Sequence, residues 1–431
     1  MKQKFPPGEV PVVAALIFLA AALCPAQQSL TWDQVKAKFE AANPALKADA
    51  DNVDEMKAAE VTAFLRPNPQ VGLSSDGLQI APHTTPGLGT HWLPLTGNQL
   101  VPSISYLHER ERKRELRLQS AKEGTQIAGS QHEDLERNLL FDLRSSFVQT
   151  LQAKAVFELA TADLAYYDKI IEISRNRFKA GDIAHIDLDR IELLRVQYEV
   201  ELQSAIVDLR TAKIQLEQLL NDRTPVEQFD VTGPFDFSEE LKPLEDFRQI
   251  ALDQRPDLRA ALEAVQQAET NHKLAIANGS ADPTFSTWYS YNPAFNNPFG
   301  RYTIGASVNV PLRVFDRNQG EKQRTQIDID RNQKLTEASR AQVFSDVDSA
   351  YAQVESSIAL LKPYKAQYKD QATRVRDTVT YAYEHGGASL MEFLNAQSDY
   401  RTVQLAYAQL VGSYLTAAGQ LNLAAGREVI Q

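Results

Sequence analysis

The chain has 431 residues, of which 43% are hydrophobic and 23% charged, and its formal net charge is −11. This composition is sufficient to bury a large apolar core, so it excludes a disordered polymer. The negative charge disfavours nucleic acid as a partner, because phosphate binding needs a basic surface.

The first 26 residues are typical of a secretory signal peptide. Two lysines open the segment, the apolar run VVAALIFLAAAL follows, and Ala26 is the small residue at the cleavage site. The run is too short for the ~20 residues of a membrane-spanning helix, which favours export over an anchor. Cys24 follows a leucine rather than the small residue that a lipoprotein signal prefers. We therefore expect the mature chain to begin near Gln27, outside the cytoplasm.

The remainder of the chain carries one pattern twice. Phe178, Gly181 and Asp187 in the first half match Tyr383, Gly386 and Glu392 in the second. Upstream, NPAL pairs with RPDL, and PNPQV pairs with ADPTF. Such self-similarity predicts a repeated architecture. We expect a first repeat over residues 27–221, a Pro-rich acidic connector over 222–245, and a second repeat over 246–431.

The predicted helices are long and have coiled-coil spacing. Three of them cover residues 46–66, 108–178 and 186–221. The second, at about 70 residues and ~1.5 Å per residue, predicts a rod of ~100 Å. In a fourth segment, from Val347 to Ala382, apolar positions alternate steps of four and three and are interrupted only by Lys365. Pro363 inside this segment predicts a local kink.

Four predicted strands lie between the helices: QVGLSS, VPSISYL, TFSTWYSY and RYTIGASVNV. The last alternates strictly, with apolar residues on one face and Thr, Gly, Ser and Asn on the other. Such a sheet either covers a soluble core or faces lipid, and the membrane is favoured because only long helices flank the strands. Four strands are too few to close a membrane barrel, so several chains must share one.

The motifs NPAL, RPDL, VPLRVFDRNQGE and YEHGGASLMEFLNAQ, in this order and spacing, resemble the outer-membrane efflux family typified by TolC. The resemblance covers essentially the whole mature chain. It implies a mainly α homotrimer with a small β part: a long α-helical coiled-coil barrel that continues into a transmembrane β-barrel, four strands per chain. It also implies a passive exit duct in the outer membrane that extends into the periplasm. The implied partners are outer-membrane lipid, a periplasmic adaptor protein and an inner-membrane transporter of the RND or ABC type.

The resemblance further assigns roles to two chain reversals, one at Gly181 and one at Gly386. In such proteins the reversals are tips that bind the adaptor and constrict to close the tunnel. The matching docking positions here are Arg177, Phe178, Gly181, Ile183, Leu188, Tyr383, Gly386, Leu390 and Phe393. For the aromatic residues among them, burial in the coiled-coil seam is an equally good interpretation.

Acidic rings narrow the closed tunnel in many relatives. The matching gate positions, just past the second tip, are Glu392 and Asn395, and Asp187 and Asp189 near the first tip are gate candidates that would compensate for a weak ring. Asn395 stands where relatives have a second acidic residue, so a cation-binding ring at Glu392 would be weakened. A solvated helix face is the alternative interpretation of all four residues.

Two other classes of function remain open at this point. A periplasmic adaptor also has a long coiled coil, but with one hairpin and a β-rich domain outside it, whereas this chain has two hairpins. An enzyme would need a nucleophile motif, metal-ligand spacing or a phosphate loop, and we find none, so we predict no catalytic, metal or cofactor site. His83 and His91 are interpreted as ordinary loop histidines. The stretch VFDRNQGE is similar to metal-efflux members of the family, but the sequence does not identify the cargo.

Overall fold

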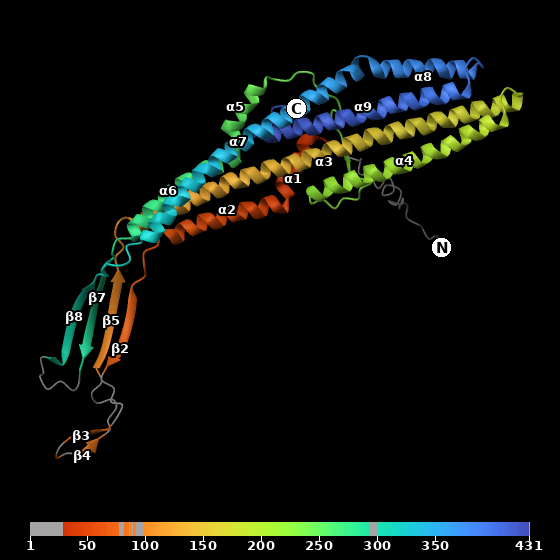
Figure 1. Ribbon diagram of the computed structural model, residues 1–431. Helices are drawn as coiled ribbons and strands as arrows, with labels where there is room; N and C mark the ends of the chain where they lie inside the picture. The colour runs from red at the N-terminus through yellow and green to blue at the C-terminus, as the bar shows by residue number, and fades with distance from the viewer. Residues whose placement is uncertain are drawn as a thin grey trace, which may run out of the picture. The chain divides into compact units, whose positions relative to one another are not determined.

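The computed structural model describes residues 29–76, 82–85, 87, 89–91, 99–292 and 300–430. The predicted signal peptide and Cys24 lie outside these residues. Within them the protein is mainly helical with a small part in strands, as predicted (Figure 1).

The helices begin and end close to their predicted bounds. The segment predicted over residues 108–178 is a single helix of 68 residues, α3. The helices are α1 (Trp32–Ala42), α2 (Pro44–Ala63), α3 (Lys113–Ala180), α4 (His185–Leu219), α5 (Leu244–Gln254), α6 (Pro256–Asn278), α7 (Gln319–Pro363), α8 (Lys369–Glu384) and α9 (Leu390–Ala425). At Pro363 the predicted disturbance takes the form of a π-helical segment, Tyr364–Tyr368, between α7 and α8. Proline lacks the N–H that an α-helix needs at this point, which accounts for the altered hydrogen bonding.

All four predicted strands are present. They are β2 (Gln70–Asp76), β5 (Gln99–Leu107), β7 (Thr284–Tyr291) and β8 (Tyr302–Asn309). Two short pairs add to them: β1 (Ser29–Leu30) with β6 (Asp230–Val231), and β3 (His83–Thr85) with β4 (Gly89–His91). The second pair lies in the segment that we predicted to be loop.

The chain forms two compact units, and each draws on both halves of the sequence. Unit 1 holds residues up to 45, 137–247 and from 347 onward; unit 2 holds residues 46–136 and 248–346. Matching elements of the two halves therefore lie together in one unit. The division of the sequence into two repeats and a connector, over 27–221, 246–431 and 222–245, stays a prediction.

The sheet of unit 2 is antiparallel in the order β2-β5-β7-β8. Its register aligns Val71 with Ile104, Ile104 with Thr287, and Thr287 with Ala306 on one face. That face is apolar and open, with Val71 82% and Ile304 81% exposed. The opposite face carries mostly serine, threonine, asparagine and glycine. The predicted division of β8 into an apolar and a polar face thus extends across the whole sheet.

In unit 1, the last part of α3 lies beside α4, α8 and α9 (Figure 1). The predicted heptad pattern in α7 is buried at Val347, Val354, Ile358 and Leu361. Beyond the π-helical segment the pattern is mixed: Val375 is half exposed, whereas Val379 packs against the buried cluster that contains Ile170 and Tyr383. The predicted seam is therefore buried within one chain along α7 and only in part along α8.

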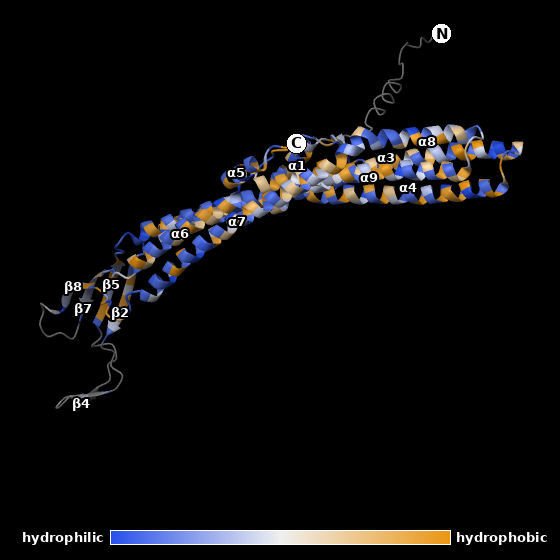
Figure 2. Ribbon diagram, turned by 45° about the horizontal axis from the view of Figure 1, so that its top comes forward, coloured by the Kyte–Doolittle hydropathy of each residue, from blue (hydrophilic) through white to orange (hydrophobic). Residues whose placement is uncertain are grey.

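Helix α4 carries an apolar stripe that the described parts of the chain leave exposed. Apolar residues at every seventh position are exposed, with Leu193 at 71%. They are Ile186, Leu193, Val200, Val207 and Ile214, which we call the α4 stripe. Figure 2 shows hydrophobic residues recurring along α4. Heptad spacing places all five side chains along one line of the helix, as in a coiled-coil seam.

Candidate functional site: the two hairpin tips

Both chain reversals have the same backbone structure. Gly181 and Gly386 have φ angles of 83° and 77°, in the left-handed region that glycine adopts at little cost. At the first reversal, Asp182 N–H donates to the Arg177 carbonyl at 2.9 Å and Gly181 N–H to the Phe178 carbonyl at 3.0 Å. These two bonds define a Schellman motif, in which a glycine just past the helix end satisfies its last carbonyl groups.

The second reversal repeats this motif. Gly387 N–H donates to the Ala382 carbonyl at 2.7 Å, and Gly386 N–H donates to the Tyr383 carbonyl at 3.1 Å. Glycine at the two reversals therefore has a definite physical basis, and we refer to residues 177–188 and 382–393 as the tips.

The tips differ in how the next helix begins. Helix α9 starts with a capping box: Glu392 accepts hydrogen bonds from the Ser389 N–H and hydroxyl, and the Ser389 hydroxyl accepts from the Glu392 N–H. Ala184 is the matching N-cap of α4 and provides no side-chain cap. The capping hydrogen bonds lower the pKa of Glu392, so its carboxylate stays charged at neutral pH.

The predicted docking residues divide into buried and accessible groups. Tyr383 and Phe393 stack with ring centroids 4.8 Å apart inside a buried cluster with Ile170, Ile171 and Ile191. Leu188 is also buried, and Leu390 packs against this cluster. For Tyr383 and Phe393 the structure therefore favours packing between helices, which is the alternative interpretation of the aromatic positions.

Phe178 is the accessible aromatic residue of the set. Its side chain is 37% exposed and meets the His185 ring edge-on, with centroids 5.3 Å apart. Ile183 is half-buried, and Gly181 and Gly386 are exposed on the turns. The accessible part of the first tip is thus a small surface around Phe178 and Gly181.

The predicted gate residues have separate environments. Asp189 pairs with the Nδ1 atom of His185 at 2.8 Å, a local contact within α4. Glu392 caps α9, whereas Asn395 is exposed one turn further along. Asp187, half-buried in the first turn of α4, occupies the position that matches Glu392. Within one chain these residues form no single cluster.

Sequence reasoning missed a set of contacts that join the two hairpins. Arg177 donates to the Tyr383 carbonyl at 2.6 Å and lies 4.9 Å from the centroid of its ring. Deeper in the bundle, Tyr166 bonds Thr380 at 2.7 Å, and the amide of buried Gln397 donates to Tyr166 at 3.0 Å. These residues are far apart in the sequence and follow no motif, so only the fold identifies them.

A half-buried carboxylate is a second feature of this bundle. Asp163 Oδ2 lies 3.8 Å from Arg401 Nε and has no hydrogen-bond partner. Arg401 pairs instead with Glu201 at 2.5 Å. Burial raises the pKa of Asp163 to about 6, and the nearby positive charges only partly oppose this shift.

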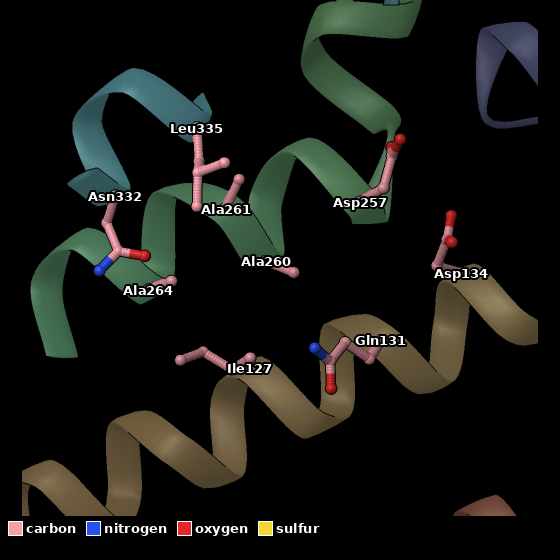
Figure 3. A pocket seen from close by; sticks show the side chains of 9 residues that line it. All are labelled: Ile127, Gln131, Asp134, Asp257, Ala260, Ala261, Ala264, Asn332 and Leu335. Atoms are coloured by element: carbon pink, nitrogen blue, oxygen red, sulfur yellow. The ribbon is translucent and has the colours of Figure 1, made fainter. Parts of the chain in front are cut away.

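Unit 2 contains a cavity of about 330 Å³ between α3, α6 and α7 (Figure 3). Small and apolar residues line most of it, including Ala260, Ala261 and Ala264 from α6 and Ile127 from α3. The lining residues come from neighbouring helices, so the cavity is a space between packed helices.

The described ranges offer neither a metal cluster nor a membrane-spanning helix. Within them no three His, Cys, Asp or Glu side chains come together in a way that would hold a metal ion. None of the helices described there combines the length and the apolar character that crossing a membrane requires.

Comparison with known proteins agrees with this architecture. Residues 247–427 match the family described as outer membrane efflux protein. The chain is 22% identical over 392 residues to the cobalt-zinc-cadmium resistance protein CzcC of Cupriavidus metallidurans, covering 89% of this chain and 86% of CzcC.

Among solved structures, the channel CusC superposes with a TM-score of 0.74 at 15% identity, covering 92% of both chains. The outer membrane protein VceC of Vibrio cholerae superposes with a TM-score of 0.70 at 15% identity, covering 92% of this chain and 96% of VceC. These findings support the efflux-channel prediction over the adaptor alternative. Over residues 247–427 the chain is therefore similar to the outer membrane efflux protein family.

Proposed function

We propose that this chain is the outer-membrane exit duct of a tripartite efflux system. It conducts cargo passively from an inner-membrane transporter and a periplasmic adaptor across the periplasm and the outer membrane, without catalysing a reaction. The observation that carries the proposal is the sheet of unit 2, whose open face is apolar from Val71 to Ile304 while its other face is polar. A sheet of this kind suits lipid on one side and water on the other.

The functional form in this proposal is a homotrimer. Strands β2 and β8 are the two edges of the sheet in one chain, and unpaired strand edges are not tolerated in lipid. Three copies of four strands would close one barrel of twelve. The α4 stripe supplies a matching apolar seam for a neighbouring copy in the helical part, where Val375 of α8 is also exposed.

The tips are the proposed docking and gating end. The accessible surface around Phe178 and Gly181 is available to an adaptor, while Tyr383 and Phe393 hold the bundle behind it. Glu392, Asp187 and Asp189 are the proposed gate carboxylates, and threefold symmetry would bring each of them to the tunnel axis in three copies.

Divalent metal ions are the proposed cargo. The support is the name of the relative CzcC, a cobalt-zinc-cadmium resistance protein, together with the similarity of VFDRNQGE to metal-efflux members. A strain lacking the gene should become sensitive to cobalt, zinc or cadmium, and the chain should restore resistance. Sensitivity to drugs or dyes alone would instead assign the duct to another cargo.

The test of the assembly is fractionation followed by mass measurement in detergent. The mature chain should be found in outer membranes as a trimer. Leu193→Glu should leave the monomer folded but abolish the trimer, because it buries a charge in the seam. Gln215→Glu is the matched control and should assemble normally, because this exposed polar position lies about 100° around the helix from the nearest stripe residue, Ile214. A soluble monomer from the unmodified chain would refute the proposal.

A further inference from the structure

Trp288 lies on the unexpected face of the sheet. The sheet alternates strictly, so Ser286, Trp288 and Ser290 of β7 point to the polar face. Across the strands, Trp288 is aligned with Ser103 on β5 and Gly305 on β8. All four neighbours are small, and Trp288 is the one aromatic residue on this face among the described strands β2, β5, β7 and β8.

The other aromatic residues of these strands belong to the apolar face. They are Tyr106, Phe285, Tyr289, Tyr291 and Tyr302, which alternate with the polar positions of β5, β7 and β8. A lipid-facing role accounts for them, because aromatic side chains are enriched on the outer surface of membrane strands. It does not account for an indole on the opposite side.

Gly305 makes room for the indole. A Cβ atom at Gly305 would lie 2.3 Å from Cζ2 and 2.4 Å from Cε2 of Trp288, far inside van der Waals contact. Gly305 is not one of the glycines with positive φ, so space rather than backbone conformation explains its lack of a side chain. The indole ring therefore lies over the backbone of β8 at Gly305 and does not project away from the sheet. The π face that is turned away from Gly305 is then part of the surface of the polar face.

We propose that Trp288 is a solute-contact residue that lines the strand-enclosed part of the duct and acts on organic solutes in addition to the proposed metal cargo. This inference depends on the proposed function, because the polar face becomes the duct wall only when three chains close the barrel. Three indoles would then offer their π faces to passing solutes. A π face attracts cations, so the solutes retained most should be organic cations and aromatic compounds. The competing interpretation is that the indole only fills the notch at Gly305 and stabilises the sheet.

Block of single-channel current by tetrabutylammonium distinguishes these two roles. In planar bilayers, Trp288→Leu should weaken the block by about two- to five-fold, the range expected for losing an exposed cation–π contact. Trp288→Phe should recover part of it, because phenylalanine keeps a π face. Tyr289→Leu, on the opposite face, is the matched control, and tetrabutylammonium should block this variant as strongly as it blocks the unmodified trimer. Unchanged block in a Trp288→Leu trimer that conducts normally would overturn the proposal.

Fluorescence quenching tests the position of the indole independently of conductance. With Trp32 and Trp92 replaced by phenylalanine, Trp288 is the sole tryptophan, and iodide should quench it while brominated lipid should not. The control places a tryptophan at Tyr289 in a Trp288→Phe background, where brominated lipid should quench. Failure of this control would refute the membrane sheet itself. If brominated lipid quenches Trp288 and the control gives its expected result, only the solute-contact role is overturned.

Discussion

The guanidinium of Arg177 on the first tip donates a hydrogen bond of 2.6 Å to the carbonyl oxygen of Tyr383 on the second. The same carbonyl accepts the Gly386 N–H that closes the second Schellman motif. One charged side chain thereby joins the two reversals, and any motion that separates the hairpins must break this bond.

Replacing Arg177 with methionine should loosen the second tip. A hydrogen bond to a charged group contributes about 1.5–3 kcal/mol, so amide exchange in the last turn of α8 should become roughly ten-fold faster or more. Arg175→Met is the control, because Arg175 pairs with Glu192 on exposed surface within the first hairpin. Equal exchange in both variants would show that the Arg177 contact does not hold the tips together.

Replacing Gly181 or Gly386 with valine should abolish efflux while leaving the trimer assembled. A β-branched residue in the left-handed region costs at least ~1–2 kcal/mol, and both glycines have φ angles in that region. Gly320→Val tests the substitution at a glycine with ordinary φ and open space and should preserve efflux. Normal resistance and adaptor crosslinking in Gly386→Val would remove the basis for assigning docking to the tips.

Glu392→Gln should weaken the block of trimer conductance by multivalent cations. Three carboxylates facing one tunnel favour a multivalent ion, whereas glutamine keeps the capping hydrogen bond to Ser389 and loses only the charge. The effect should fade as salt rises, because charges in water are screened over ~10 Å at 0.1 M. Loss of block in Asp187→Asn but not in Glu392→Gln would assign the ring to the first tip.

Asp163→Asn should stabilise the tip bundle at pH 7.5 and have little effect below pH 4. The pKa of Asp163 is raised to about 6 in the folded protein. Between about pH 4 and pH 6 the folded protein keeps a proton that the unfolded chain has released, so the free energy of unfolding falls as pH rises through this range. Asparagine carries no charge at any pH and avoids this loss. After discounting for partial solvation, we expect a gain of about 1 kcal/mol. Arg401 keeps its partner Glu201 in the variant. Thermal unfolding across this pH range measures the difference, and a uniform shift at all pH values would contradict the assignment.

Local sequence signals are sufficient to predict an element wherever a short pattern of residues determines the backbone conformation. Glycine alone reaches φ angles near 80° cheaply, so Gly181 and Gly386 mark the reversals in the sequence itself. The period of two fixes the faces of β8, and the heptad spacing from Val347 onward indicates coiled coil in α7. Pro363 predicts a disturbance, but the sequence pattern does not specify its form as a π-helical segment over Tyr364–Tyr368.

The fate of the individual tip residues was decided by tertiary structure. Tyr383 and Phe178 occupy matching positions of the two repeats, yet one is buried and the other accessible, because side chains from α3, α4 and α9 pack around Tyr383. The contacts of Arg177 with Tyr383 and of Gln397 with Tyr166 join residues about 200 positions apart, and no periodic pattern records such pairs. The sequence by itself determined the elements, their order and the reversals, since these follow from nearest-neighbour sterics and hydrophobic period. Only the tertiary structure decided which side chains meet, because burial depends on all the helices packed around a residue.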